Sequence, residues 1–271
     1  MPVETTAEVK IWRRRERGKQ FAIWFGWLSG VALFVTCWQA ISATTMWPFV
    51  WDSPRVAGDI FSRMVPPAWP YLDELWAPLW DTINIATLGT LLAILLAVPV
   101  AFCAARNTTP SVLVVRPLAL LIIVSSRSIN SLIWALLLVA IIGPGVLSGI
   151  IAIGLRSIGF IAKLLYEAIE EIDESQVEAI TATGAGRAQV MAYGIVPQIM
   201  PAFAGICVFR WDINIRESTV LGLVGAGGIG LQLQSSLNIL AWPQVTVILL
   251  AIFATVLVSE WVSAKVRHAI I

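Results

Sequence analysis

The sequence predicts an all-α protein that crosses a membrane with six helices. Of its 271 residues, 58% are hydrophobic and only 13% are charged, and its mean hydropathy is +0.82. A soluble domain is nearer to about 25% charged. Long apolar segments recur along the chain, each long enough to cross a bilayer as a helix. The predicted spans are residues 21–44, 81–105, 117–142, 147–172, 197–221 and 243–264.

Composition excludes several classes of site. The cysteines Cys37, Cys103 and Cys207 lie in apolar stretches without a C-x-x-C pair, so neither a disulfide framework nor a zinc site is expected. The only histidine, His268, lies beside the C-terminus, which argues against histidine-based catalysis or metal binding. With a net charge of +1 and no basic patch interleaved with aromatic residues, the chain is not expected to bind nucleic acid.

The first 80 residues form three predicted parts. Residues 1–20 are polar and rich in Lys and Arg, which places them in the cytoplasm beside the first span. Residues 21–44 are too long for a signal-peptide core and are predicted to be an uncleaved anchor helix. Residues 45–80 carry many prolines and tryptophans and are predicted to be an external loop with an interfacial helix over 56–64.

Residues 81–271 are predicted to form a core of five helices, with a cytoplasmic loop over 173–196. The third span is interrupted by a polar stretch over 125–130. Six spans place both termini and the 173–196 loop in the cytoplasm, and the excess of Lys and Arg in these segments agrees with that orientation.

The 173–196 loop is predicted to be a helix-turn-helix knob. Ser175 and Glu178 fit a capping box, so a helix is expected to start near Ser175. Gly184 and Gly186 are expected to end that helix by taking positive φ. A second short helix is expected from Arg187 to Tyr193, followed by Pro197 in the first turn of the fifth span.

This spacing resembles the EAA loop of ABC importer permeases, E-A-A, three residues, G, nine residues and I-x-L-P. Glu178, Ala179, Gly184 and Pro197 match the pattern, whereas Ile180, Gly194 and Val196 depart from it. In that family the loop fits a groove on the cytoplasmic ATPase subunit. The resemblance therefore implies a set of ATPase-coupling residues, namely Glu178, Ala179, Gly184, Gly186, Arg187 and Pro197.

A glycine-rich stretch after the fifth span contains a G-x-G-x-x-G match over 225–230. No strand is expected before it and no acidic residue follows until Glu260, so it is not interpreted as a dinucleotide fingerprint. A tight turn with close backbone approach is expected instead. The stretch resembles one in phosphonate- and methionine-type ABC permeases, and its predicted gating and packing residues are Gly222, Gly225, Gly227, Gly228 and Gly230.

Two more segments carry the resemblance. Arg127-Ser128-Ile129-Asn130 resembles an R-S-I-P motif with Asn130 in place of the proline, and residues 209–222 are close to a phosphonate-type pattern. Over residues 80–271 the chain is identified as similar to phosphonate/phosphate-type ABC importer permeases. The resemblance implies a type I ABC importer permease fold in the inner membrane and a second copy of the chain. It also implies two cytoplasmic ATPases and an extracytoplasmic substrate-binding protein.

The chain has no Walker A sequence, so ATP and magnesium are assigned to the partner ATPase and no cofactor to this chain. Coupling is expected to be mechanical, with ATPase closure moving the knob and the helices alternating between inward-open and outward-open states.

Charged residues inside the predicted spans indicate the cargo. Cations outnumber the acids Asp212 and Glu217, which favours an anionic substrate, because intramembrane charges usually face a bundle interior or a water-filled path. Asp212 and Arg216 are four residues apart and are expected to pair, whereas Arg210 has no acid at that spacing. The residues predicted to line the substrate pathway are Arg127, Ser128, Asn130, Arg210, Asn214 and Arg216. A purely structural role for these arginines stays open.

The function predicted from the sequence is therefore a permease subunit for a phosphonate, a phosphate or a phosphite. One alternative is a methionine-type or other ABC permease, against which the arginine-rich fifth span argues. A gradient-driven secondary transporter is a second alternative, although the inverted repeats typical of that class are not seen. A membrane-embedded enzyme would need a cluster of catalytic side chains that a lone terminal histidine does not supply.

Overall fold

The structure is a computed structural model that describes residues 3–6, 9–12 and 17–270 of the chain. The chain divides into two units, residues 1–59 and 60–271. In the first unit, strands β1 (Val3–Thr6) and β2 (Val9–Trp12) form an antiparallel hairpin. The helix α1 (Arg17–Thr44) follows, with an apolar surface that is exposed along its length. It agrees with the predicted first span, whereas the sequence did not predict the hairpin.

Residues 45–80, predicted to be an external loop with one interfacial helix, are largely helical. Helix α2 spans Trp47–Met64, longer than the expected interfacial helix over 56–64, and contains Pro54. In the second unit, the 3-10 helix η1 (Trp69–Leu75) leads directly into α3 (Trp76–Ala104). Several of the prolines lie in the first turns of these helices, where proline is tolerated, although Pro54 lies inside α2. The number of prolines in a stretch therefore does not by itself predict a loop.

Five helices or helix pairs of the second unit have the length and apolarity of membrane spans, and α1 has them in the first. The second unit contains α3, α4 (Val115–Ser128), α5 (Ser131–Ile142), α6 (Val146–Glu170), α9 (Val196–Leu221) and α11 (Trp242–Ile270). The described residues hold five single helices of this kind, or six spans if α4 and α5 count as one. Apart from the short hairpin of the first unit, the predicted all-α, multi-pass fold is thus confirmed.

The predicted third span is not one straight helix. Helices α4 and α5 meet at an angle of 88°. Ile129 takes extended backbone, and Asn130 begins the new helix by accepting a hydrogen bond from the Leu132 N–H at 3.2 Å. A side-chain cap of this kind competes with continuation of the helix, which explains a break in an apolar stretch.

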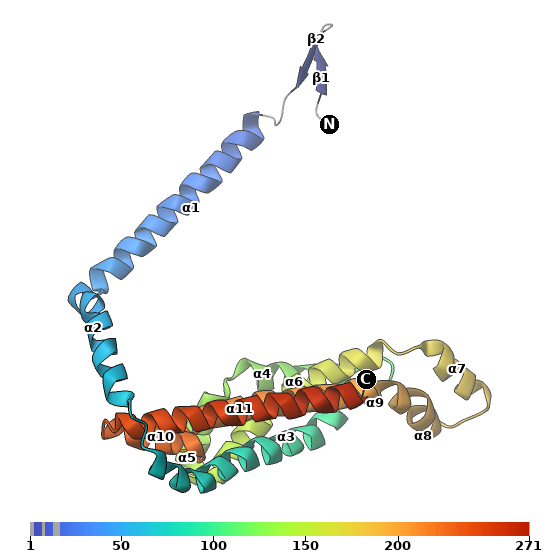
Figure 1. The fold of residues 1–271 in the computed structure, drawn as a ribbon. Coiled ribbons are helices and arrows are strands. Elements are labelled where there is room, and N and C mark those ends of the chain that lie inside the picture. The colour runs from blue at the N-terminus through green and yellow to red at the C-terminus, as the bar shows by residue number, and fades with distance from the viewer. Residues whose placement is uncertain (1–2, 7–8, 13–16, 271) are drawn as a thin grey trace. The chain divides into compact units, whose positions relative to one another are not determined.

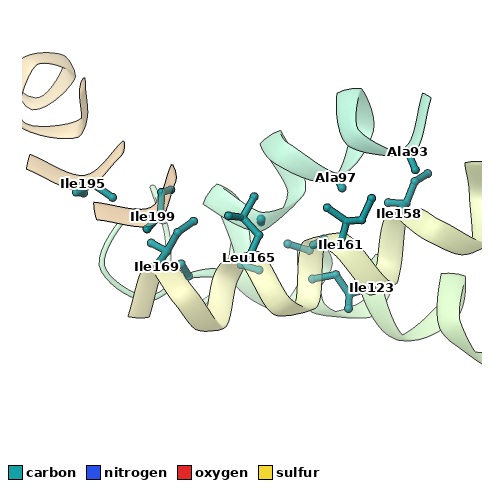
Figure 2. Packing of buried hydrophobic residues seen from close by; sticks show 14 residues of the cluster. Ala93, Ala97, Ile123, Ile158, Ile161, Leu165, Ile169, Ile195 and Ile199 are labelled. Carbon is teal, nitrogen blue, oxygen red and sulfur yellow. The ribbon is translucent and has the colours of Figure 1, made fainter. Parts of the chain in front are cut away.

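Helix α6 lies at the centre of the second unit and contacts α3, α4, α5 and α9. Small residues on α3 let α6 approach closely, as is typical of helix packing in membranes. Figure 2 shows Ala93 and Ala97 of α3 against Ile158 and Ile161 of α6. Farther along the same core, Leu165 of α6, Ile195 directly before α9 and Ile199 of α9 complete the packing.

The remaining short elements lie at the two ends of this bundle. The knob contains α7 (Glu174–Ala182), α8 (Arg187–Val190) and the π-helical turn η2 (Met191–Ile195), and it projects beyond the bundle (Figure 1). At the other end of α9, the 3-10 turn η3 (Gly222–Val224) and α10 (Ile229–Asn238) lead to α11.

Candidate functional site

A cavity of about 570 Å³ opens among α5, α6 and α9. Helix α6 contributes Arg156, while α9 contributes Arg216 and Glu217 from adjacent positions. The apolar lining comes mainly from α9, and the amino-terminal end of α5 adds polar groups. The lining residues are Asn130, Ser131, Leu132, Arg156, Phe209, Ile213, Arg216, Glu217, Val220 and Leu221. This cavity therefore combines an apolar wall with a few convergent charges, the usual character of a small-molecule site.

Glu217 is the acid that connects Arg156, which lines this cavity, with Arg210 of α9. Its Oε1 accepts from Arg156 Nη1 at 2.7 Å and from Arg210 Nη2 at 3.5 Å. Arg156 Nη1 also donates to Ser131 Oγ at 3.2 Å, which joins α5 to the same group. The other carboxylate oxygen, Oε2, is buried and has no hydrogen-bond partner among the described residues.

Arg210 lies beneath the cavity and does not line it. Its side chain is only 4% exposed, its Nε donates to Ser157 Oγ at 2.9 Å, and its guanidinium stands over the Phe160 ring at 5.1 Å from the centroid. Arg210 has no acid four residues away, as the sequence indicated, but it does have an acid partner, because Glu217 lies seven residues along the same helix, two turns on the same face. These contacts make Arg210 a structural member of the bundle.

Asn214, another predicted pathway residue, is also fully buried. It accepts from Ser157 Oγ at 3.1 Å and donates to Thr90 Oγ1 at 2.8 Å. Through these contacts α3, α6 and α9 share one polar network inside the bundle. Such a network satisfies its own polar groups and leaves Asn214 away from the cavity.

The predicted pair between Asp212 and Arg216 is confirmed. Arg216 Nη2 donates to Asp212 Oδ2 at 2.6 Å, and Ser259 Oγ of α11 donates to Asp212 Oδ1 at 2.8 Å. The Asp212 side chain is buried, whereas that of Arg216 is 51% exposed and lines the cavity. Asp212 therefore anchors Arg216 while leaving much of the guanidinium open.

Arg127 and Ser128 occupy the exposed carboxyl end of α4, next to the break. Arg127 makes no hydrogen bond or ion pair with any residue that the structure describes. Its Cγ lies 2.8 Å from the place that a Cβ on Gly159 would take, and Gly159 follows the cavity residue Arg156 by three positions. Arg127 is thus about one helical turn from the cavity along α6.

Among the predicted pathway residues, Asn130 and Arg216 line the cavity, and Arg127 lies near it. Arg156, Ser131 and Glu217 were not in that predicted set. For Arg156 and Glu217 the available signal was a charge inside a span, but 61 residues separate them and no local spacing relates them. The pairing requires knowledge of which faces of α6 and α9 meet.

In the knob, the cap of the first helix lies two residues before the predicted start. Asp173, and not Ser175, is the N-cap, and its carboxylate accepts from Ser175 Oγ at 2.6 Å and from Ser175 N at 3.0 Å. These two hydrogen bonds hold the pKa of Asp173 below its usual value. Gly184 ends the helix with φ +84°, as predicted.

Gly186 differs from its prediction, since its φ is −69° and it begins α8. Its N–H donates to Gln189 Oε1 at 2.9 Å. The expected second short helix, from Arg187 to Tyr193, is not separate, because it continues through η2 into α9, with Pro197 in the first turn of α9 as predicted. Glu178, Ala179, Gly184 and Arg187 are all exposed, so the knob presents a free surface.

The glycine-rich turn brings segments into close contact at the opposite end of the bundle. A Cβ on Gly230 would collide with the Thr219 carbonyl oxygen and would lie 2.9 Å from Gly222 Cα, so the start of α10 meets the end of α9 and η3 backbone to backbone. Gly225, Gly227 and Gly228 all have positive φ. The Gly225 carbonyl accepts from Gly145 N at 3.0 Å, which ties this turn to the start of α6. The predicted close backbone approach is confirmed.

No group of three or more His, Cys, Asp or Glu side chains that could hold a metal ion occurs among the described residues. The polar groups that line the cavity are guanidinium and carboxylate groups, with hydroxyl and amide groups at its α5 edge.

The comparison with protein families decides the identity. Residues 89–266 match the family described as binding-protein-dependent transport system inner membrane component. The chain belongs to this family. It is a permease subunit of an ABC importer and a multi-pass membrane protein.

Individual relatives agree with this assignment. The chain is 38% identical over 250 residues to the phosphite transport system permease protein PtxC of Stutzerimonas stutzeri, covering 92% of this chain and 87% of the relative. It is also 38% identical over 212 residues to the phosphate-import permease protein PhnE of Mycolicibacterium smegmatis, covering 78% of this chain and 40% of the relative.

Solved structures support the fold. An inward-facing MetNI methionine ABC transporter chain matches with a TM-score of 0.65 at 19% identity, covering 74% of this chain and 98% of that chain. An amino acid ABC transporter chain solved with histidines matches with a TM-score of 0.63 at 18% identity, covering 74% of this chain and 95% of that one. The type I ABC importer permease fold is thereby confirmed.

Proposed function

We propose that this permease moves a small phosphorus oxyanion, namely a phosphonate, a phosphate or a phosphite, by ATP-driven alternating access. The observation that carries the proposal is the cavity among α5, α6 and α9, which two arginines and one carboxylate line. Its arginines outnumber its single carboxylate, and this excess of positive charge favours an anion. Relatives whose names specify phosphite and phosphate transport support the same class of cargo.

The chemistry of guanidinium suits this cargo. A phosphorus oxyanion carries one or two negative charges and several acceptor oxygens, which arginine matches through forked, charge-assisted hydrogen bonds. Arg216 and Arg156 line the cavity, and Arg127 of α4 lies against Gly159, about one turn along α6 from Arg156. Successive weak contacts suit a subunit that must release its cargo. We therefore assign Arg216, Arg156 and Arg127 to one path.

The partners follow from this proposal. Two cytoplasmic ATPases would bind and hydrolyse ATP with magnesium, and an extracytoplasmic binding protein would deliver the oxyanion. The exposed knob is the surface assigned to the ATPase, through Glu178, Ala179 and Gly184. Closure of the ATPase would move the knob and rock the helices between inward-open and outward-open states. Both termini and the knob are assigned to the cytoplasm.

We further propose that two copies of this chain form the complete path about a two-fold axis. Two copies carrying different tags, expressed together with the ATPase, are expected to purify as one complex. A competent complex with only one copy of this chain, paired with a different permease chain, would contradict the homodimer. The names HtxC and HtxE, two distinct phosphite permease relatives in Stutzerimonas stutzeri, make this outcome worth testing.

The deciding experiment is uptake into proteoliposomes that contain the permease with its ATPase and binding protein. Phosphite, phosphate and methylphosphonate are offered separately, with methionine and sulfate as comparison cargoes. We expect ATP-dependent accumulation of at least one phosphorus oxyanion and none of methionine. Uptake of methionine alone would support the methionine-type alternative, and uptake driven by an ion gradient without ATP would support a secondary transporter.

A further inference from the structure

We propose that Glu217 is a resident counter-anion of the cavity and that the oxyanion displaces its carboxylate from Arg156. This inference rests on the proposed function, because it assumes that the cavity accepts an oxyanion. It adds a specificity-determining role for Glu217, an acidic residue in a site that favours anions.

The first observation is that Glu217 already occupies the position of an anionic ligand. Its Oε1 accepts from Arg156 Nη1 at 2.7 Å, the short distance of a charge-assisted hydrogen bond. Arg156 Nη1 is held by Ser131 Oγ as well, at 3.2 Å. In the arrangement described, a carboxylate oxygen therefore makes the contact that an oxygen of a phosphite or phosphate would make.

The second observation is that this arrangement satisfies only half of the carboxylate. Glu217 Oε2 is buried with no hydrogen-bond partner among the described residues. A buried polar atom without a partner costs free energy, whereas the same oxygen in water would be hydrated. Release of the carboxylate into the cavity of about 570 Å³ recovers that cost, so the ion pair is one that a better ligand can replace.

The third observation is that the two arginines on Glu217 Oε1 are held differently. Arg210 is 4% exposed, and its contacts with Ser157 and Phe160 do not involve the carboxylate. The carboxylate is proposed to leave Arg156 alone and to stay near Arg210, whose buried charge it continues to compensate. Arg156 is 31% exposed and lines the cavity, as does the half-exposed Arg216. Displacement therefore exposes Arg156 for cargo and leaves Arg210 as a buried support.

This arrangement has a consequence for specificity. Neutral cargo cannot compensate the positive charge of the arginines in place of the carboxylate. Glu217 therefore remains bound to Arg156, and its carboxylate keeps the position that cargo would take. An oxyanion with three acceptor oxygens can take the place of Oε1 and contact Arg216 as well. By competing for Arg156, Glu217 would thus favour oxyanions over neutral cargo and would also limit how tightly an oxyanion binds.

The test measures equilibrium binding of radiolabelled inorganic phosphate to the full permease in lipid nanodiscs. Glu217→Gln removes the charge, and Glu217→Asp keeps the charge on a side chain one methylene too short for the Arg156 contact. We expect both variants to bind phosphate about tenfold more tightly than the wild type, and Glu217→Gln to transport it more slowly because release is impaired. Size-exclusion profiles establish that each variant is folded.

A double-mutant cycle separates displacement from a general effect of charge. The gain from Glu217→Gln is expected to vanish in an Arg156→Gln background, because the two residues compete through one contact. If the gain persists there, or if Glu217→Asp binds phosphate as the wild type does, the displacement is refuted.

The arginine variants show which proposal fails. If Arg156→Gln and Arg216→Gln weaken phosphate binding but the Glu217 variants do not tighten it, only the counter-anion role is lost. If neither arginine variant changes phosphate binding, the cavity is not an oxyanion site and the proposed function is lost as well.

Discussion

Ile180 of α7 packs against Gly194 of η2, where a Cβ on Gly194 would lie 3.4 Å from Ile180 Cδ1. These are two of the positions at which the knob departs from the EAA pattern, which has alanine at the first and isoleucine at the second. In this chain the larger side chain therefore stands on α7 and the smaller one on the π-helical turn, at two positions in contact. We interpret the two departures as compensating for each other in volume.

We predict that Gly194→Ile impairs transport and weakens the knob, because its side chain would extend into the space that Ile180 fills. Ile180→Ala leaves a void there and should cost less, since α7 has no fully buried residue. The double variant Ile180→Ala with Gly194→Ile is expected to restore uptake to near the wild-type rate. Uptake and co-purification of the ATPase measure the coupling, and strictly additive effects would contradict the compensation.

The two glycines between α7 and α8 provide a matched pair for a coupling test. Gly184 has φ +84° with no atom within 4 Å of an added Cβ, so strain and not collision opposes substitution there. A residue with a side chain costs about 1–2 kcal/mol in this left-handed conformation. We predict that Gly184→Asp abolishes transport while the membrane domain still assembles, because strain and a new charge alter the surface assigned to the ATPase.

Gly186→Ala is the control for that experiment. Gly186 has φ −69° and an added Cβ would only contact Gln189 Oε1 at 3.7 Å, so this variant should transport normally. ATPase activity stimulated by cargo is measured alongside uptake. Normal activity and uptake of Gly184→Asp would remove the coupling role of the knob.

Local spacing predicted those features of the chain that depend on neighbours in sequence. The i,i+4 pair of Asp212 and Arg216, the positive φ of Gly184 and the place of Pro197 all follow from residues within one or two turns. The pairing of Arg156 with Glu217 could not be predicted in the same way, since it depends on how α6 and α9 pack. The 88° break between α4 and α5 depends on a single cap at Asn130.

Depth in a span was also a poor guide to the role of each arginine. Arg210 and Arg216 are six residues apart on α9, yet the first is buried among Ser157 and Phe160 and the second is half exposed in the cavity. Six residues correspond to rather more than one and a half turns, so the two side chains leave different faces of the helix. Which face meets α6 is set by tertiary packing.

The proposed orientation is tested by cysteine labelling. In a background where Cys37, Cys103 and Cys207 are replaced by serine, single cysteines are placed at Arg187, Arg267 and Ile60. A membrane-impermeant maleimide should label the first two only from the cytoplasmic side and the third only from outside, as the excess of basic residues in the cytoplasmic segments requires. Labelling of position 187 from outside would contradict the six-span orientation.

The last prediction separates an arginine of the transport path from a structural one. Arg127 is exposed and makes no hydrogen bond or ion pair with the described residues, so Arg127→Gln should leave expression and thermal stability unchanged. Uptake of the oxyanion should fall at least about tenfold, which corresponds to about 1.4 kcal/mol at the barrier. Arg127→Lys should recover only part of the rate, because it returns the charge without the forked donors of the guanidinium.

Arg210→Gln is the structural comparison. Breaking a buried pair costs about 3–5 kcal/mol, so this variant should lose thermal stability in a fluorescence size-exclusion assay. Normal uptake by a stable Arg127→Gln variant would show that this charge serves no path, and unchanged stability of Arg210→Gln would contradict the structural role inferred from its contacts with Ser157 and Glu217.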